Sequence, residues 1–119
     1  MRFDIVPVPK PRMTQRDRWA KRPAVLRYFA FADELREAAS ELKWQVPSRI
    51  DLEFGMPMPK SWSNRKKLEM DDQPHQQKPD IDNLIKAFLD ALCDDDSFVY
   101  VVHAAKYWCS EPYIKCATI

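Results

Sequence analysis

The sequence predicts a single α+β (α/β) domain with a mixed sheet and the element order β-α-β-α-β-β. A chain of 119 residues is the size of one domain. Two stretches repeat apolar residues with the period of a helix, and two others alternate apolar and polar residues as half-buried strands do. Strands and helices in this succession are typical of such a domain. We therefore expect residues 1–119 to form one domain.

The first half of the chain contains three of the expected elements. Residues 2–8 alternate apolar and polar side chains and end in prolines, which predicts a strand. A basic, proline-bounded loop follows at residues 10–22. Residues 24–43 place their apolar side chains on one face, which predicts a long amphipathic helix. Residues 49–56 alternate again and predict a half-buried strand.

The second half begins with a polar segment, residues 57–77, that we expect to be a loop. A loop of this length inside a compact domain is usually functional or mobile. Residues 81–92 predict a helix. Residues 98–109 and 112–118 are expected to be the final strands, joined by a turn that contains a proline.

The helix expected at residues 81–92 has one apolar and one charged face. Its apolar residues recur at helical spacing and are Ile81, Leu84, Ile85, Phe88, Leu89 and Leu92. Asp82, Lys86 and Asp90 lie four residues apart on the other face. The charged face is therefore available for chemistry at the protein surface.

Two carboxylates stand where this helix begins. Pro79 suits a position just before a helix, which makes Asp80 the expected N-cap. Residues two apart in a regular helix point about 200° apart, so Asp80 can approach Asp82 only from outside the first turn. Mg²⁺ binds oxygen ligands, often one or two carboxylates with water and phosphate. The helix N-terminus also favours anions such as phosphate.

Structural alternatives exist for each of these residues. An N-terminal Asp80 is often only a cap, and Asp82 with Lys86 is often only a surface ion pair. The acidic run at residues 94–96 could be a solvated turn. The combination of these features with a basic segment upstream favours a metal-dependent phosphodiester-cleaving site.

The net charge of +1 hides an uneven distribution of charge. Residues 10–27 and 60–67 are basic, whereas residues 69–96 are strongly acidic. Basic segments attract DNA phosphates, and a bound metal would offset the acidic centre. Solvated surface is the alternative for the N-terminal arginines. Trp62, which lies among basic residues, could stack on bases or anchor its segment to the core.

Composition excludes several other classes of protein. Three cysteines without a CxxC pair fit a reducing compartment, and we expect a cytoplasmic protein. Two scattered histidines do not suit a structural zinc site. His75 is expected to shape its loop or contact DNA. Neither a signal peptide nor a membrane span is expected.

Several segments together resemble the RusA family of Holliday-junction resolvases, particularly its phage and prophage branch. The specific signal is the run Lys78-Pro79-Asp80-Ile81-Asp82-Asn83-Leu84-Ile85-Lys86. Weaker matches in the same order are Pro9-Lys10-Pro11-Arg12, residues 59–67, Pro74-His75, Asp90-Ala91-Leu92, Asp95-Asp96-Ser97 and Lys106-Tyr107-Trp108. The resemblance covers most of the chain.

The resemblance implies a small dimeric endonuclease that cuts four-way DNA junctions with Mg²⁺, or alternatively Mn²⁺, and no small-molecule cofactor. The family's metal-binding carboxylates match Asp80, Asp82 and Asp96, with Asp95 as the alternative within the same acidic pair. Its active-site lysine matches Lys86, which we expect to stabilise charge on the scissile phosphate. Candidate DNA-binding residues are Lys10, Arg12, Arg16, Lys60, Trp62, Arg65, Lys66, Lys67 and Lys78.

Apolar residues of the first helix and the final strands are candidates for the dimer interface. They offer more apolar surface than one small core obviously needs, and they are Tyr28, Phe29, Phe31, Val99, Val101, Val102, Tyr107 and Trp108. The alternative is that these residues belong to the core.

Two departures from the family pattern affect the third ligand. Only Cys93 and Asp94 link the helix to the acidic pair, whereas some members carry a longer loop. Asp94 also stands where we would expect a glycine. A nucleotide hydrolase and a junction-binding protein without cleavage remain as rival functions.

Overall fold

The computed structural model describes residues 1–12 and 22–119. The elements that it contains within these residues are β1 (Arg2–Phe3), α1 (Pro23–Glu41), β2 (Arg49–Pro57), α2 (Asn64–Met70), α3 (Ile81–Leu92), β3 (Val101–Cys109) and β4 (Tyr113–Thr118). The predicted α+β class is confirmed.

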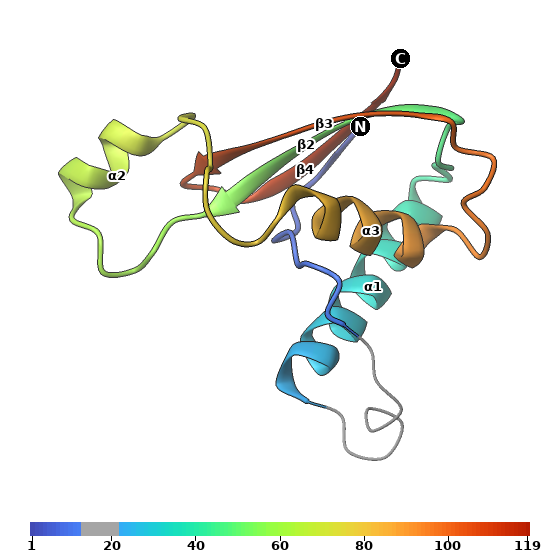
Figure 1. Cartoon of the computed structure of the whole chain (residues 1–119), viewed down its shortest axis with the longest axis horizontal. Helices are drawn as coiled ribbons and strands as arrows, with labels where there is room; N and C mark the ends of the chain where they lie inside the picture. Colours follow the sequence, from blue (N-terminus) through green and yellow to red (C-terminus); the bar gives the residue numbers. More distant parts are fainter. Residues whose placement is uncertain (13–21) are drawn as a thin grey trace.

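The four strands form one mixed sheet in the order β1-β4-β2-β3. β2 pairs with β3 in parallel, while β4 is antiparallel to both β2 and β1. The register aligns Ile50 of β2 with Val102 of β3, and Met56 with Trp108. Figure 1 shows α1 and α3 on the same side of this sheet. The sheet is therefore covered on one face by these two helices.

The core lies between the sheet and the two helices. Alternate residues of β2 point toward the helices and are buried: Ile50, Leu52, Phe54 and Met56. Leu35 of α1 and Phe88 of α3 pack in the same cluster and are fully buried. Burying a side chain of this size contributes about 1.5–3 kcal/mol. The apolar stripe of α3 is thus fixed against the sheet, and its charged face is turned outward.

Three boundaries differ from the sequence-based expectation. The first strand pairs with β4 only at Arg2 and Phe3, so residues 4–8 of the expected strand lie outside the ladder. α1 ends at Glu41, and Lys43 just beyond it has a positive φ of 52°. β3 begins at Val101, because residue 99 is still part of a turn, in which its N–H donates to the Asp96 carbonyl at 3.0 Å.

The expected loop at residues 57–77 contains a helix, α2, so the element order is β-α-β-α-α-β-β. Ser63 starts this helix, because its hydroxyl accepts a hydrogen bond from the Lys66 N–H at 3.1 Å. None of the α2 residues is buried. Seven residues without a buried face leave no apolar period in the sequence, which explains why the pattern predicts a loop here.

Candidate active site

Asp80 stands at the N-cap position of α3 but does not cap it. Its backbone is extended, and its side chain makes no capping hydrogen bond. One carboxylate oxygen instead accepts from the Lys78 ammonium group at 3.0 Å, and the Asp80 side chain is about half exposed. The peptide bond between Lys78 and Pro79 is cis. Asp80 thus lies outside the first helical turn, with its carboxylate at the surface, as the sequence predicted.

Asp82 and Lys86 lie on the exposed face of α3, one turn apart. Among the ion pairs of the described residues, the two do not pair with each other. Asp90, one turn further along, is held by Lys10 at 3.3 Å. The simple surface ion pair between Asp82 and Lys86 is therefore absent from the described part of the chain, and both groups remain available at the surface.

Lys10 joins the N-terminal segment to α3. Its backbone N–H donates to the Asn83 carbonyl at 3.0 Å, and its ammonium group lies 4.3 Å from the centre of the Tyr28 ring. With the ion pair to Asp90, these contacts leave only 20% of the Lys10 side chain exposed. Lys10 therefore has a structural role, and little of its side chain is free for DNA.

The acidic turn, residues 94–96, follows the other end of α3. Asp95 accepts a hydrogen bond from the Ser97 N–H at 2.9 Å, and this bond lowers the pKa of the Asp95 carboxyl. Burial and the nearby charges of Asp96, Asp90 and Asp94 raise the pKa of the Cys93 thiol. All three aspartates of the turn are exposed.

The structure does not bring the two acidic groups together within one chain. α3 has 12 residues, and a helix of this length spans about 18 Å. Asp80 and Asp82 are at its beginning, and the acidic turn is beyond its end (Figure 1). Among the described residues, the grouping of three potential metal ligands is Asp71, Asp72 and Cys109, not Asp80, Asp82 and Asp96. The short link after the helix keeps the turn at the far end.

The segment before α3 is attached to the free edge of β3. The Asp72 N–H donates to the Trp108 carbonyl at 2.8 Å, and the Trp108 N–H donates to the Gln73 carbonyl at 2.9 Å. The His75 N–H then donates to the Lys106 carbonyl at 3.1 Å. Residues 72–75 therefore follow β3 much as a fifth strand would, and they lead the chain to the start of α3.

Lys106 holds the next part of this segment. Its ammonium group donates to the carbonyl of Gln77 and to that of Pro79, both at 2.6 Å. Burial lowers the pKa of Lys106, and the charge of Asp80 partly opposes this shift. The sequence assigns no site role to Lys106, because only the fold brings it to the residues that precede Asp80.

An aromatic stack attaches the segment before α2 to the same strand. The rings of Trp62 and Trp108 are 4.8 Å apart, and those of His75 and Trp108 are 4.3 Å apart. Lys66 places its ammonium group 5.3 Å from the centre of the Trp62 ring. These contacts favour the interpretation of Trp62 as an anchor over that of a base-stacking residue.

His75 is buried, with 4% of its surface exposed. Its Nδ1 has no hydrogen-bond partner among the described residues. Burial, followed by the positive charge of Lys106, lowers the pKa of His75. His75 therefore shapes its segment from inside the fold, and it is not exposed to DNA.

The basic residues around α2 are largely at the surface. α2 extends away from the sheet, on the side of the molecule where α3 begins (Figure 1). Lys60, Arg65 and Lys66 are exposed, and Arg65 pairs with Glu69 at 3.3 Å. Lys67 is half-buried, while Lys78 and Arg12 are exposed. Arg16 lies outside the described residues.

Comparison with known proteins assigns a family. The family model described as "Endodeoxyribonuclease RusA" matches residues 3–117. A curated protein, "Uncharacterized protein YqaN" of Bacillus subtilis (strain 168), is 35% identical over an alignment of 77 residues; the match covers 58% of this chain and 54% of that protein. The match thus spans about half the length of that relative. No solved structure matches.

Within the described residues, none of the helices is long and apolar enough to cross a membrane.

Proposed function

This chain belongs to the RusA endodeoxyribonuclease family, and we propose that it is a phosphodiester hydrolase that resolves four-way DNA junctions with Mg²⁺. The observation that supports this proposal is the pair of exposed carboxylates, Asp80 and Asp82, at the start of α3. The exposed basic surface of α2 lies beyond the same end of the sheet (Figure 1). An acidic centre beside a basic arm suits a metal-assisted reaction on a polyanion.

Asp80 and Asp82 fit the ligand requirements of Mg²⁺. This ion commonly uses one or two carboxylates and completes its shell with water and substrate phosphate. A bound Mg²⁺ would lower the pKa of a water molecule and stabilise charge on the attacking and leaving oxygens. Lys86, one turn from Asp82, would stabilise negative charge on the scissile phosphate.

We keep Asp95 and Asp96 as proposed ligands. Because they lie past the far end of α3, they can bind the same metal as Asp80 and Asp82 only if the turn rearranges or a second subunit supplies them. Asp80 and Asp82 are therefore proposed as the primary metal site of the chain.

Substitution of Asp82 tests the assignment. We expect Asp82→Asn to abolish Mg²⁺-dependent cleavage of a labelled synthetic four-way junction while leaving binding unchanged or tighter. The amide keeps the shape but removes the charge that attracts the metal and repels DNA phosphates. Asp33→Asn, on the exposed face of α1, is the matched control and should cut normally. Cleavage by Asp82→Asn at near the wild-type rate would refute the metal site.

The same assay separates the rival functions. A junction-binding protein without cleavage would retain the DNA uncut at every Mg²⁺ concentration. A nucleotide hydrolase would release phosphate from nucleotides and leave the junction intact. The hollow of about 610 Å³ beside Asp80 is lined by Lys78, Ile81 and Lys106. It opens on the surface, which suits an extended ligand.

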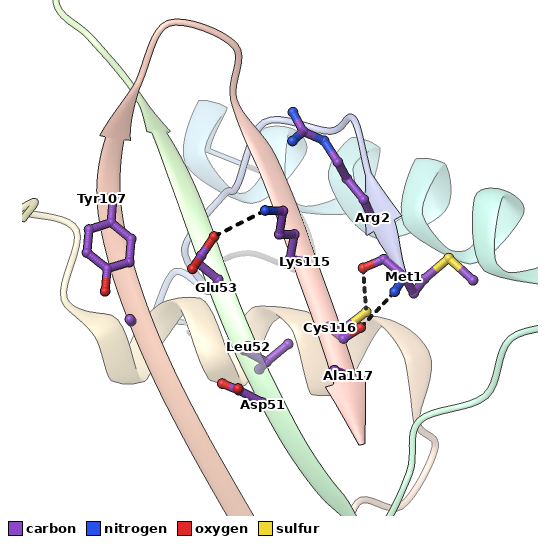
Figure 2. A pocket seen from close by; sticks show the side chains of 10 residues that line it. Met1, Arg2, Asp51, Leu52, Glu53, Tyr107, Lys115, Cys116 and Ala117 are labelled. Carbon is purple, nitrogen blue, oxygen red and sulfur yellow. Dashed lines mark hydrogen bonds and ion pairs between the residues drawn. The ribbon is translucent and has the colours of Figure 1, made fainter. Parts of the chain in front are cut away.

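We also propose a homodimer, because paired cuts in a junction require two sites and a twofold axis relates two identical ones. Of the aromatic residues expected at its interface, Tyr28, Phe31 and Trp108 are buried and belong to the core. Phe29 is exposed, and Tyr107 is half-buried on the sheet face opposite the helices (Figure 2).

The sheet face opposite α1 and α3 offers a better surface for a second copy. Figure 2 shows its side chains, with Glu53 of β2 beside Lys115 of β4, which are 3.8 Å apart. Asp51 of β2 and Arg2 of β1 extend this pattern around a hollow of about 490 Å³. Acidic and basic residues on neighbouring strands are self-complementary, because a twofold rotation can place the acids of one copy against the bases of the other.

A further inference from the structure

We propose that Lys106 is a positioning residue of the active site, which sets the location of Asp80 by holding the backbone that precedes it. The metal-binding part of this proposal rests on the proposed function, whereas the structural part does not. Lys106 is on β3, 27 residues after Pro79, and although Lys106-Tyr107-Trp108 is part of the family resemblance, that resemblance assigns Lys106 no role in the site.

The hydrogen bonds of Lys106 determine what it can do. An ammonium group has three donors, and two of those of Lys106 are used by the Gln77 and Pro79 carbonyls at 2.6 Å each. Hydrogen bonds with one charged partner are stronger than neutral ones. Lys106 is therefore committed to the protein backbone, in contrast to the exposed Lys86 and Lys78.

The two carbonyls bracket the residues directly before Asp80. Pro79 is adjacent to Asp80, so fixing its carbonyl limits where the Asp80 backbone can lie. The Asp80 carbonyl in turn accepts the first hydrogen bond of α3, from the Leu84 N–H at 3.3 Å. Lys106 thus acts on both the carboxylate and the start of the helix.

The strand that carries Lys106, β3, is held firmly in the sheet. β3 pairs with β2 along its whole length, and Trp108 on the same strand is buried. The segment 72–75 is already attached to the edge of β3 by backbone hydrogen bonds. Between His75 and the start of α3, the Lys106 side chain is a fixed link from this strand to the backbone that carries Asp80.

The test is Lys106→Met, which keeps the aliphatic chain and removes the three donors. Amide hydrogen exchange of the free protein measures positioning without DNA or metal. We expect faster exchange at Leu84 than in wild type, with unchanged exchange in β2 and β4. Calorimetric titration with Mn²⁺ should show affinity reduced by about 10–100-fold, the usual cost of removing a group that orients a metal ligand.

Controls distinguish positioning from a general loss of charge. Lys43→Met, at the exposed end of α1, should leave exchange and Mn²⁺ affinity unchanged. Lys106→Arg keeps charge and donors and should recover most of the affinity. If the methionine variant does not fold, as judged by near-ultraviolet circular dichroism, Lys106→Gln is measured in its place.

The outcomes separate this proposal from the proposed function. Unchanged Leu84 exchange together with unchanged Mn²⁺ affinity in a folded variant would overturn the role of Lys106. Faster exchange in a protein whose wild type cuts no junction would support that role and refute the resolvase function. If the wild-type protein cuts the junction but Lys106→Met leaves amide exchange and Mn²⁺ affinity unaltered, the resolvase function would be supported and the role of Lys106 refuted.

Discussion

At the scale of single residues, burial decides which charged groups are structural and which remain accessible at the surface. The sequence suggests contact with DNA for both His75 and Lys10. In the structure, however, His75 is buried, and Lys10 contacts Asp90 and Tyr28. Asp82 and Lys86 remain exposed. Residue type and spacing identify candidate groups, whereas only the fold shows which are accessible.

The buried His75 predicts a pH dependence of stability. Its pKa is lowered in the folded state, so the unfolded state binds more protons once the pH falls below the ordinary value of about 6.5. Its stabilising contribution is therefore present above that pH and is lost as the pH falls. We expect the free energy of unfolding to decrease between pH 7 and 5 by up to about 1.4 kcal/mol per pH unit.

Denaturant unfolding across this range measures the effect. His75→Phe keeps an aromatic ring against Trp108 but cannot be protonated, so its dependence on pH should be flatter. His103→Gln changes an exposed histidine of β3 and should retain the wild-type slope. Equal slopes in wild type and His75→Phe would show that His75 does not control this transition.

At the scale of elements, α3 and α2 show what sequence patterns can predict. The boundaries of α3 agree with the expectation, because six apolar residues at helical spacing and Pro79 before the start leave little alternative. α2 was not predicted because it buries no residue, although Ser63 carried a capping signal. The roles of Lys106 and of the β3 edge could not be predicted, since both depend on contacts between distant segments.

The exposed basic face of α2 predicts how DNA binding depends on salt. Replacing Arg65, Lys66 and Lys67 together by glutamine should weaken binding to any DNA sequence. The slope of log K against log salt should become flatter by roughly 0.9 for every phosphate that the variant no longer contacts. Fluorescence anisotropy from low to high salt measures the slope, and Lys43→Gln serves as control. An unchanged slope in the triple variant would place the DNA on another surface.

At the scale of the whole molecule, the sheet divides the protein into a covered and an open face. α1 and α3 use one face for the core, and the other carries the alternating charges of β2 and β4 (Figure 2). The alternation in residues 49–56 predicts a strand with one solvated face, and the structure confirms it. Three of the aromatic residues expected at the interface, Tyr28, Phe31 and Trp108, are needed in the core of a small domain.

We expect light scattering at low micromolar concentration to give about twice the chain mass of 14.1 kDa. Lys115→Glu would set like charges against the acidic residues of the second copy and should shift the protein toward monomer. Lys43→Glu changes an equivalent charge at the end of α1 and should remain dimeric. A clean wild-type monomer that still makes paired cuts would contradict the dimer.

The connection after α3 limits how far the acidic turn can reach. Only Cys93 separates the helix end from Asp94, and β3 begins soon afterwards. Returning along about 18 Å of helix takes about five or six extended residues at 3.3–3.6 Å each. The length of this connection therefore decides where the acidic turn can lie. The short connection keeps the aspartates at the far end of α3. An insertion of about five or six residues, by contrast, would be long enough for the same subunit to bring them to Asp82. An insertion here would thus change the proposed metal site from one divided between subunits to one contained in a single chain, without changing any ligand.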